Sequence, residues 1–546
     1  MSVREGARAG VNLTRTMSAL PGTDAQGSAA LPWPGRRVAT AGASVRLVRA
    51  GVAAAVVLLT AGSVALRVGV LHGGFWVDEG LSVGIASHPL GQVPGLLIQD
   101  GAPPLYYVLL HGWMNLFGRS EVRTHELSLL FAILTVPAAW WAGASLLGRR
   151  VGLTCCALAA ASPFLTAYAH ETRMYSLLAL LSLLATACFL HVFVRGRRRW
   201  LPGFVAALTL ALYTHNWGAF LAATAGVAFL VCLWRAEPGR RRALALDGAI
   251  AFGATGLLFA PWVPTVLAQA AHTGSPWSRT PGVAALLHAG AILSGGLVAF
   301  GVLLVAAGLG LVRIWRAGER SERTLVACLV LLGAGTLLAA WGFSQLAPAW
   351  ASRYFAVALG PLLLAAALGL SRAGRLGLAG LVVVLGISVL APTNPAYLHK
   401  SNVREVSAAI RPDLHRGDLV LSLQPEQVPV LRYYLGGGLR WATNLGPVPD
   451  TGIMDWRDAL ARLQAATWER NLPPLLSRVR VGEQLLLVLP IPRGSRGAPW
   501  PRLVRHRELE WFGAMLRDRR FAVVQNLRTP GLTPASVRLV LFRRVR

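Results

Sequence analysis

Charged residues are scarce in this sequence. They make up 14% of its 546 residues, while hydrophobic residues make up 54%, and a soluble globular protein carries about a quarter charged residues. This scarcity excludes an ordinary cytosolic enzyme and a disordered chain. Cysteine is also scarce: its five occurrences lie in apolar runs without metal-ligand spacing, which excludes a disulfide scaffold and a cysteine zinc site. Lysine occurs once, as Lys400, which we interpret as coding bias toward arginine.

Long apolar runs fill most of the first 391 residues. A membrane span needs about 20 mostly apolar residues, so we predict a mainly α-helical, polytopic membrane protein with roughly eleven spans. The predicted spans are 50–71, 125–147, 151–168, 174–194, 200–214, 217–234, 243–267, 286–312, 324–345, 354–370 and 376–391. The run 103–118 opens with two prolines and is expected to be an interfacial helix rather than a span.

The arginines indicate the orientation in the membrane. The chain has 53 basic and 24 acidic residues, a net charge of +29. Its arginines gather in every second loop, at 149–150, 195–199, 235–242, 313–323 and 372–375. Because positive charge marks cytoplasmic loops, we expect a plasma-membrane protein with its N-terminus in the cytoplasm and its C-terminus outside. The basic excess is thus explained by membrane orientation, so membrane lipid is an expected partner and nucleic acid is not.

Composition also divides the chain into three predicted parts. Residues 1–43 are predicted to be a disordered basic cytoplasmic tail, and residues 44–391 a transmembrane domain. Residues 392–546 are more polar and predict a soluble extracytoplasmic α/β domain. There, strand-like runs at 418–423, 484–490 and 536–542 alternate with helix-like stretches at 456–466 and 507–516.

Five polar segments fall on the predicted outer side. They are FWVDEGLS with Asp78 and Glu79, DGAPPLYY from Asp100 to Tyr107, HETRMY with Arg173, YTHNW with His215, and SRYF with Arg353. Taken singly, each has an ordinary explanation: a helix cap in a solvated loop, an interface turn, an ion pair with Glu171, a satisfied structural histidine, and a snorkelling arginine. Together they suit a lipid-linked phosphate substrate. Arginines would hold the phosphate, a carboxylate would act as general base, and aromatic rings would contact sugar or isoprenoid.

These segments, in this order, resemble glycosyltransferase family 39. The likeness rests on WVDEG, DxxPPLYY, Ser120 with Glu121 and Arg123, ETRMYSL, YTHN, and RYF with Pro361, and it covers about residues 51–391. That family includes protein O-mannosyltransferases and the lipid A aminoarabinose transferase, with the GT-C membrane fold. The resemblance implies inverting transfer of a mannose-like sugar from a polyprenyl-phosphate donor. The acceptor would be an extracytoplasmic protein, cell-wall glycan or lipid.

The resemblance also implies roles for individual residues. Asp78 would be the general base, Glu79 would support it or position the donor, and Arg173 and Arg353 would contact the donor phosphate. The substrate pocket would include Asp100, Tyr106, Tyr107, Glu171, Tyr175 and His215. One position departs from the family pattern: Ala102 precedes the double proline where many relatives carry His or Lys. No cofactor is expected, and a divalent cation held by Asp78 and Asp100 is left as an open alternative.

Two other functions stay open from the sequence. A transporter or flippase of lipid-linked sugars would use the same charged cavity without chemistry. Such proteins usually contain internal repeats and broken helices near the middle of the membrane, and this sequence shows no internal repeat. A membrane anchor for a C-terminal binding module would need neither so many spans nor an acidic first loop.

Overall fold

The computed structural model describes residues 35–390, 399–491, 497–527 and 535–546. The chain divides into two compact units, residues 1–53 and 54–546. The described part of the first unit is the beginning of helix α1 (Gly35–Val68). The second unit contains the other helices and a β-sheet. Residues 1–34 and 391–398 lie outside the described residues, so the predicted tail and domain boundary stay predictions.

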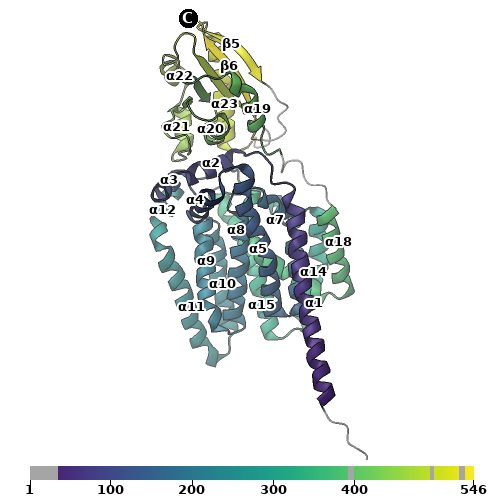
Figure 1. Cartoon of the computed structure of the whole chain (residues 1–546). Helices are drawn as coiled ribbons and strands as arrows, with labels where there is room; N and C mark the ends of the chain where they lie inside the picture. Colours follow the sequence, from purple (N-terminus) through teal and green to yellow (C-terminus); the bar gives the residue numbers. More distant parts are fainter. Residues whose placement is uncertain (1–34, 391–398, 492–496, 528–534) are drawn as a thin grey trace, which may run out of the picture. The chain divides into compact units, whose positions relative to one another are not determined.

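Helices occupy the positions of the predicted apolar runs. After α1 they are α2 (Val77–Ala86), α3 (Val93–Asp100), α4 (Leu105–Phe117), α5 (Glu121–Leu147), α6 (Arg149–Ala160), α7 (Pro163–Ala169), α8 (Tyr175–Phe189), α9 (Leu201–Thr214), α10 (Gly218–Arg235), α11 (Pro238–Phe259), α12 (Val263–His272), α13 (Ala284–Ser294), α14 (Leu297–Ala317), α15 (Arg320–Val330), α16 (Thr336–Leu346), α17 (Ala356–Arg372) and α18 (Arg375–Leu390). Figure 1 shows α5, α8 and α9 side by side. Since α8 and α17 are apolar and buried on nearly every face, they lie at the centre of the bundle.

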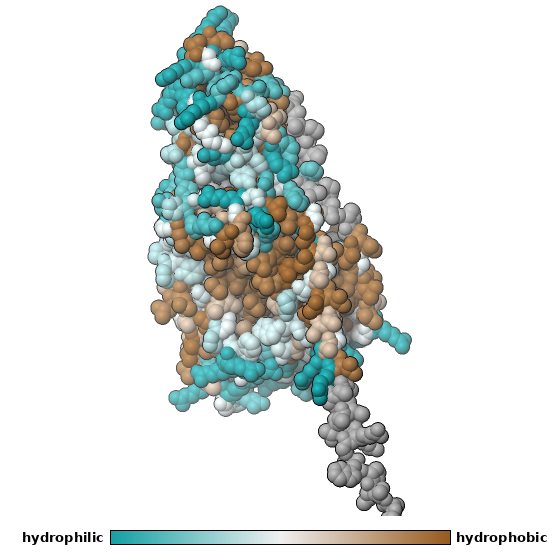
Figure 2. Space-filling view, viewed as in Figure 1, coloured by the Kyte–Doolittle hydropathy of each residue, from teal (hydrophilic) through white to brown (hydrophobic). Residues whose placement is uncertain are grey.

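The predicted count of eleven spans is not confirmed. Within the described residues, eight helices are long and apolar enough to cross a membrane, or up to ten if two bent pairs each count as one span. The predicted run 286–312 is interrupted by Gly295 and Gly296, both with positive φ, which separate α13 from α14. Helices α9 and α18 have only 14 and 16 residues. Figure 2 shows hydrophobic side chains covering much of the helical part, with hydrophilic ones below them and over the sheet.

The C-terminal region, residues 399–546, forms the predicted α/β structure. Its described strands are β1 (Leu419–Ser422), β2 (Arg440–Thr443), β3 (Gly446–Pro447), β4 (Gln484–Pro490), β5 (Phe521–Leu527) and β6 (Val537–Arg544). They form one sheet in the order β3-β2-β1-β4-β6-β5. Strand β1 pairs in parallel with β2 and β4, and the other pairs are antiparallel. The described helices of this region are α19 (Val403–Ile410), α20 (Val428–Leu435), α21 (Ala459–Ala465), α22 (Trp468–Leu476) and α23 (Pro499–Arg517).

The C-terminal region packs directly on α2. A Cβ at Gly80 would lie 2.6 Å from the backbone nitrogen of Val430, and a Cβ at Gly84 would lie 2.1 Å from the carbonyl oxygen of Gly452. Glycine at both positions therefore allows the backbones to approach closely. This packing places the C-terminal region beside the acidic segment of α2.

Candidate active site

Helix α2 begins at the acidic segment. Asp78 and Glu79 lie in its first turn, where the helix dipole favours negative charge. The Glu79 carboxylate also caps the helix, because its Oε2 accepts a hydrogen bond from the backbone nitrogen of Trp76 at 3.3 Å. The chain thus has a local reason to place two carboxylates here, and the two side chains have different surroundings.

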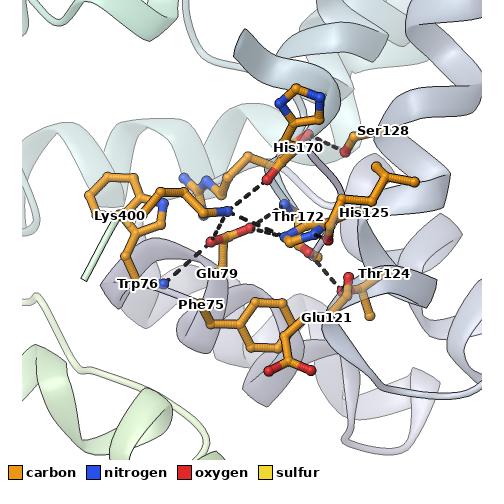
Figure 3. A network of polar contacts seen from close by, with 12 residues as sticks. Phe75, Trp76, Glu79, Glu121, Thr124, His125, Ser128, His170, Thr172 and Lys400 are labelled. Atoms are coloured by element: carbon orange, nitrogen blue, oxygen red, sulfur yellow. Dashed lines mark hydrogen bonds and ion pairs between the residues drawn. The ribbon is translucent and has the colours of Figure 1, made fainter. Parts of the chain in front are cut away.

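Glu79 is buried within a hydrogen-bond network (Figure 3). Its Oε1 lies 2.6 Å from Nε2 of His125 and accepts a 2.8 Å hydrogen bond from the backbone nitrogen of Thr172. Its Oε2 forms a 2.6 Å ion pair with Nζ of Lys400. The side chain has 0% exposure, so the solvated-loop explanation is wrong for Glu79. With both oxygens engaged, Glu79 is suited to holding neighbouring elements in place.

Asp78 keeps acceptor capacity beside two arginines. Its Oδ2 lies 3.5 Å from Nη2 of Arg353, and the two side chains are 17% and 22% exposed. This ion pair is not a hydrogen bond, and Oδ2 accepts none from the described residues. The Arg173 guanidinium is also close, because its Nη1 lies 3.4 Å from the backbone oxygen of Asp78. A carboxylate of this kind can accept a proton from an incoming hydroxyl.

Arg173 joins several predicted site residues. Its Nη1 donates to the hydroxyls of Ser82 at 3.1 Å and Tyr107 at 3.2 Å. The Tyr107 hydroxyl in turn donates to Oδ2 of Asp100 at 3.3 Å. Asp100 ends α3, and Gly101 caps that helix with a φ of +96°. Although burial opposes it, the surrounding tyrosines and carboxylates hold the pKa of Arg173 well above its usual value.

Aromatic rings surround the two arginines. The guanidinium of Arg353 lies 5.7 Å from the ring of Trp76 and 5.3 Å from that of Tyr354. His215 lies between two tyrosines, with ring centroids 4.5 Å from Tyr354 and 6.0 Å from Tyr175. Burial, with smaller contributions from the two arginines, lowers the pKa of His215 to about 3. His215 is therefore neutral and adds a polar ring without charge.

The two remaining predicted residues differ in their contacts. Tyr106 is fully buried, and its hydroxyl lies 3.1 Å from that of Ser128, which donates to the backbone oxygen of Arg173. Tyr106 therefore stabilises the loop of Arg173 indirectly, through Ser128. Glu171 is half-buried, and its Oε2 accepts no hydrogen bond from the described residues. Burial raises the pKa of Glu171 to about 7, with Asp78 and Glu79 adding to the rise and Lys400 and Arg353 opposing it.

Sequence reasoning missed two residues that contact Glu79 and one buried carboxylate of the C-terminal region. His125 and Lys400 both contact Glu79, so the interpretation of Lys400 as coding bias overlooked its place in the network. Glu426 follows β1 and is 6% exposed. One of its oxygens accepts hydrogen bonds from Trp500 and Gln424, both at 2.8 Å, and the other accepts none from the described residues. The only signal in the sequence that could have pointed to this network was Lys400 itself, as the one lysine of an arginine-rich chain.

The geometry around Asp78 and Asp100 bears on the open alternative of a metal ion. Within the part of the chain that the structure describes, no group of three or more His, Cys, Asp or Glu residues is arranged to hold a metal ion. Asp100 instead accepts a hydrogen bond from Tyr107, and Asp78 pairs with Arg353.

Known proteins resemble this chain in part of its sequence and in its fold. Residues 101–267 match the family model of dolichyl-phosphate-mannose-protein mannosyltransferases. No curated protein matches the chain by sequence.

Solved structures extend the likeness to most of the chain. ArnT from Cupriavidus metallidurans in the apo state is 15% identical, with a TM-score of 0.55 over 92% of this chain and 98% of that one. ArnT bound to undecaprenyl phosphate is 14% identical, with a TM-score of 0.55 over 89% of this chain and 97% of that one. The arabinofuranosyltransferase AftD from Mycobacteria is 16% identical, with a TM-score of 0.52 over 91% of this chain and 40% of that one. The oligosaccharyltransferase AglB from Archaeoglobus fulgidus is 10% identical, with a TM-score of 0.51 over 81% of this chain and 70% of that one. These likenesses confirm the predicted GT-C membrane fold.

Proposed function

We propose that this protein is a membrane glycosyltransferase that transfers a sugar from a polyprenyl-phosphate donor to an acceptor outside the cytoplasm. The observation that carries the proposal is the Asp78 carboxylate, which retains an unbonded oxygen beside Arg353 and Arg173. The fold shared with ArnT, which has been solved with undecaprenyl phosphate, supports a lipid-linked donor. The transporter alternative gains no support, because the matching family model and AftD and AglB are named as transferases.

In the proposed reaction, Asp78 takes the proton from an acceptor hydroxyl as its oxygen attacks the anomeric carbon. The bond from that carbon to the phosphate oxygen breaks on the opposite face, so the configuration inverts. Arg173 and Arg353 stabilise the negative charge of the departing polyprenyl phosphate in a site of low dielectric constant. Trp76 and Tyr354 lie beside the Arg353 guanidinium and offer apolar faces to a sugar ring.

A deletion strain tests the proposal whichever sugar the protein transfers. We expect it to lose one glycan, lipid or protein modification of the envelope and to accumulate a polyprenyl-phosphate-linked sugar, both read by mass spectrometry. The wild-type gene should restore the modification, whereas Asp78→Asn at equal membrane abundance should leave it at least about 100-fold lower, because a general base contributes 10²–10⁴-fold. Unchanged glycans, lipids and protein glycosylation in the deletion strain would refute the function. Full restoration by Asp78→Asn would refute the role of Asp78 alone.

A further inference from the structure

Three consecutive residues at the start of the C-terminal region connect it to the acidic segment. Nζ of Lys400 donates to Oε2 of Glu79 and to the backbone oxygen of His170, both at 2.6 Å (Figure 3). The Ser401 hydroxyl donates to the backbone oxygen of Phe75 at 2.7 Å. The third residue, Asn402, forms hydrogen bonds with the sheet.

Asn402 completes this connection. Its amide nitrogen donates to the backbone oxygen of Val537 at 2.8 Å, and its amide oxygen accepts from the nitrogen of Val537 at 2.7 Å. Val537 begins β6. Strand β6, the connecting residues and the segment before α2 are therefore linked through adjacent hydrogen bonds.

The same connection spans the two sides of the proposed site. Glu79 accepts from the backbone of Thr172, while Lys400 donates to the backbone of His170. The ion pair thus holds the loop 170–173 against the first turn of α2. Asp78 precedes Glu79 on that turn, and Arg173 follows Thr172 on that loop. This pair therefore helps to set the separation between the proposed base and one proposed phosphate contact, together with the hydrogen bonds from Arg173 to the backbone oxygen of Asp78 and to Ser82.

The pair resists separation because it is buried. The side chains of Lys400 and Glu79 are 8% and 0% exposed, and removal of one partner would leave an uncompensated charge in the interior, which is strongly destabilising. The amine of Lys400 is directed to Glu79 and His170, so it acts through these groups. Lys400 is therefore not placed to touch the substrate itself.

We propose that Lys400 is a positioning residue of the transfer reaction, through which the C-terminal region fixes Asp78 relative to Arg173. This inference rests on the proposed function, and it assigns the C-terminal region a part in the chemical step. A misplacement of about 1 Å at a reacting group can cost about 100-fold in rate.

The test uses the full-length chain in lipid nanodiscs and measures kcat and KM. We expect Lys400→Met to lower kcat about 100-fold, in line with that cost of misplacement, with the acceptor KM changed less than about threefold. Lys400→Arg should recover part of the rate because it restores the charge. The control is Arg520→Met, which removes an exposed arginine whose Nη2 pairs with Asp518 at 2.7 Å before β5, and it should retain the wild-type rate.

A double variant covers the case in which Lys400→Met fails to fold. Lys400→Met with Glu79→Gln removes both buried charges and should melt near the wild-type temperature, yet turn over about 100-fold slower because the connection is weakened. A folded variant, single or double, with wild-type kcat would overturn the proposal, as would a loss confined to the acceptor KM.

A second measurement separates this inference from the proposed function. Since Lys400 is the only lysine in the chain, an amine-reactive reagent followed by mass spectrometry of its peptide reports on this side chain alone. We expect Lys400 to stay unmodified in the folded protein and to react in Glu79→Gln. Rapid reaction in the wild type would refute the buried pair even if sugar transfer were demonstrated. Protection without any sugar transfer would refute the function and leave the connection in place.

Discussion

At the scale of single residues, Glu171 is expected to make the stability of the protein depend on pH. Its carboxyl group lies in the loop that carries Arg173, and burial raises its pKa to about 7. In the unfolded chain a glutamate titrates near 4.3, so between about pH 4.5 and 7 the folded protein binds more protons than the unfolded one. The free energy of unfolding contributed by this group therefore falls as pH rises through that range. Glu171→Gln should remove this part of the pH dependence.

Thermal melting between pH 5 and 8 measures the effect. The melting temperature of Glu171→Gln should rise relative to the wild type as the pH increases, while the two proteins should be similar near pH 5. The matched control is Glu469→Gln, which changes an exposed glutamate of α22 and should follow the wild type throughout. Parallel curves for Glu171→Gln and the wild type would contradict the assignment of this titration.

The sequence allowed prediction of the residue types at the site but not of their supports. Asp78, Arg173 and Arg353 stand in short polar segments between apolar runs, where an ionisable residue is conspicuous. Lys400 comes from the C-terminal region, and its contact with Glu79 depends on long-range packing that no local pattern encodes. The periodicity of the sequence likewise cannot predict that Glu79 is fully buried while the adjacent Asp78 is partly exposed.

At the scale of elements, the contact of α2 with the C-terminal region depends on glycine. Replacing glycine by alanine inside a helix ordinarily stabilises it by about 0.8–1 kcal/mol. At Gly84 the new methyl group would meet the carbonyl oxygen of Gly452, and overpacking of this kind costs about 1–3 kcal/mol. Gly84→Ala should therefore destabilise the protein and lower sugar transfer, as measured by melting temperature and product formation.

Gly95→Ala provides the control for this prediction. Gly95 lies within α3, and a Cβ there would meet nothing within 4 Å, so the ordinary helix preference should prevail. Its melting temperature should equal or exceed that of the wild type. If Gly84→Ala behaved like Gly95→Ala, the close approach of α2 to the C-terminal region would be wrong.

The predictability of the elements follows from their burial. Strands β1 and β4 are buried along their whole length and read as continuous apolar runs, so the sequence revealed them. Strand β2 has the sequence RWAT, which is not a continuous apolar run, and β3 has only two residues. Strand β5 is mostly exposed and pairs with β6 at the edge of the sheet. Hydropathy likewise located the helices but not the break at Gly295 and Gly296.

At the scale of the whole molecule, the arginine-bearing loops come together as the loop pattern requires. Arg372 pairs with Glu322 at 2.7 Å, and Arg198 pairs with Asp247 at 2.7 Å. Arg235 and Arg320 line one hollow of about 430 Å³. Loops that the sequence assigned to one side of the membrane thus contact one another, although their separation along the chain is large. Their common side is predicted to be the cytoplasm.

Cysteine accessibility tests this orientation for the whole chain. The five native cysteines are all buried, so single introduced cysteines should dominate labelling by a membrane-impermeant maleimide. Leu516→Cys places a thiol on an exposed site of α23, and Gly239→Cys places one among the arginines at the start of α11, where a new side chain meets nothing within 4 Å. In intact spheroplasts we expect labelling of Leu516→Cys alone, and of both variants after permeabilisation. The reverse pattern would place Asp78 on the cytoplasmic side, where an acceptor outside the cell could not reach it.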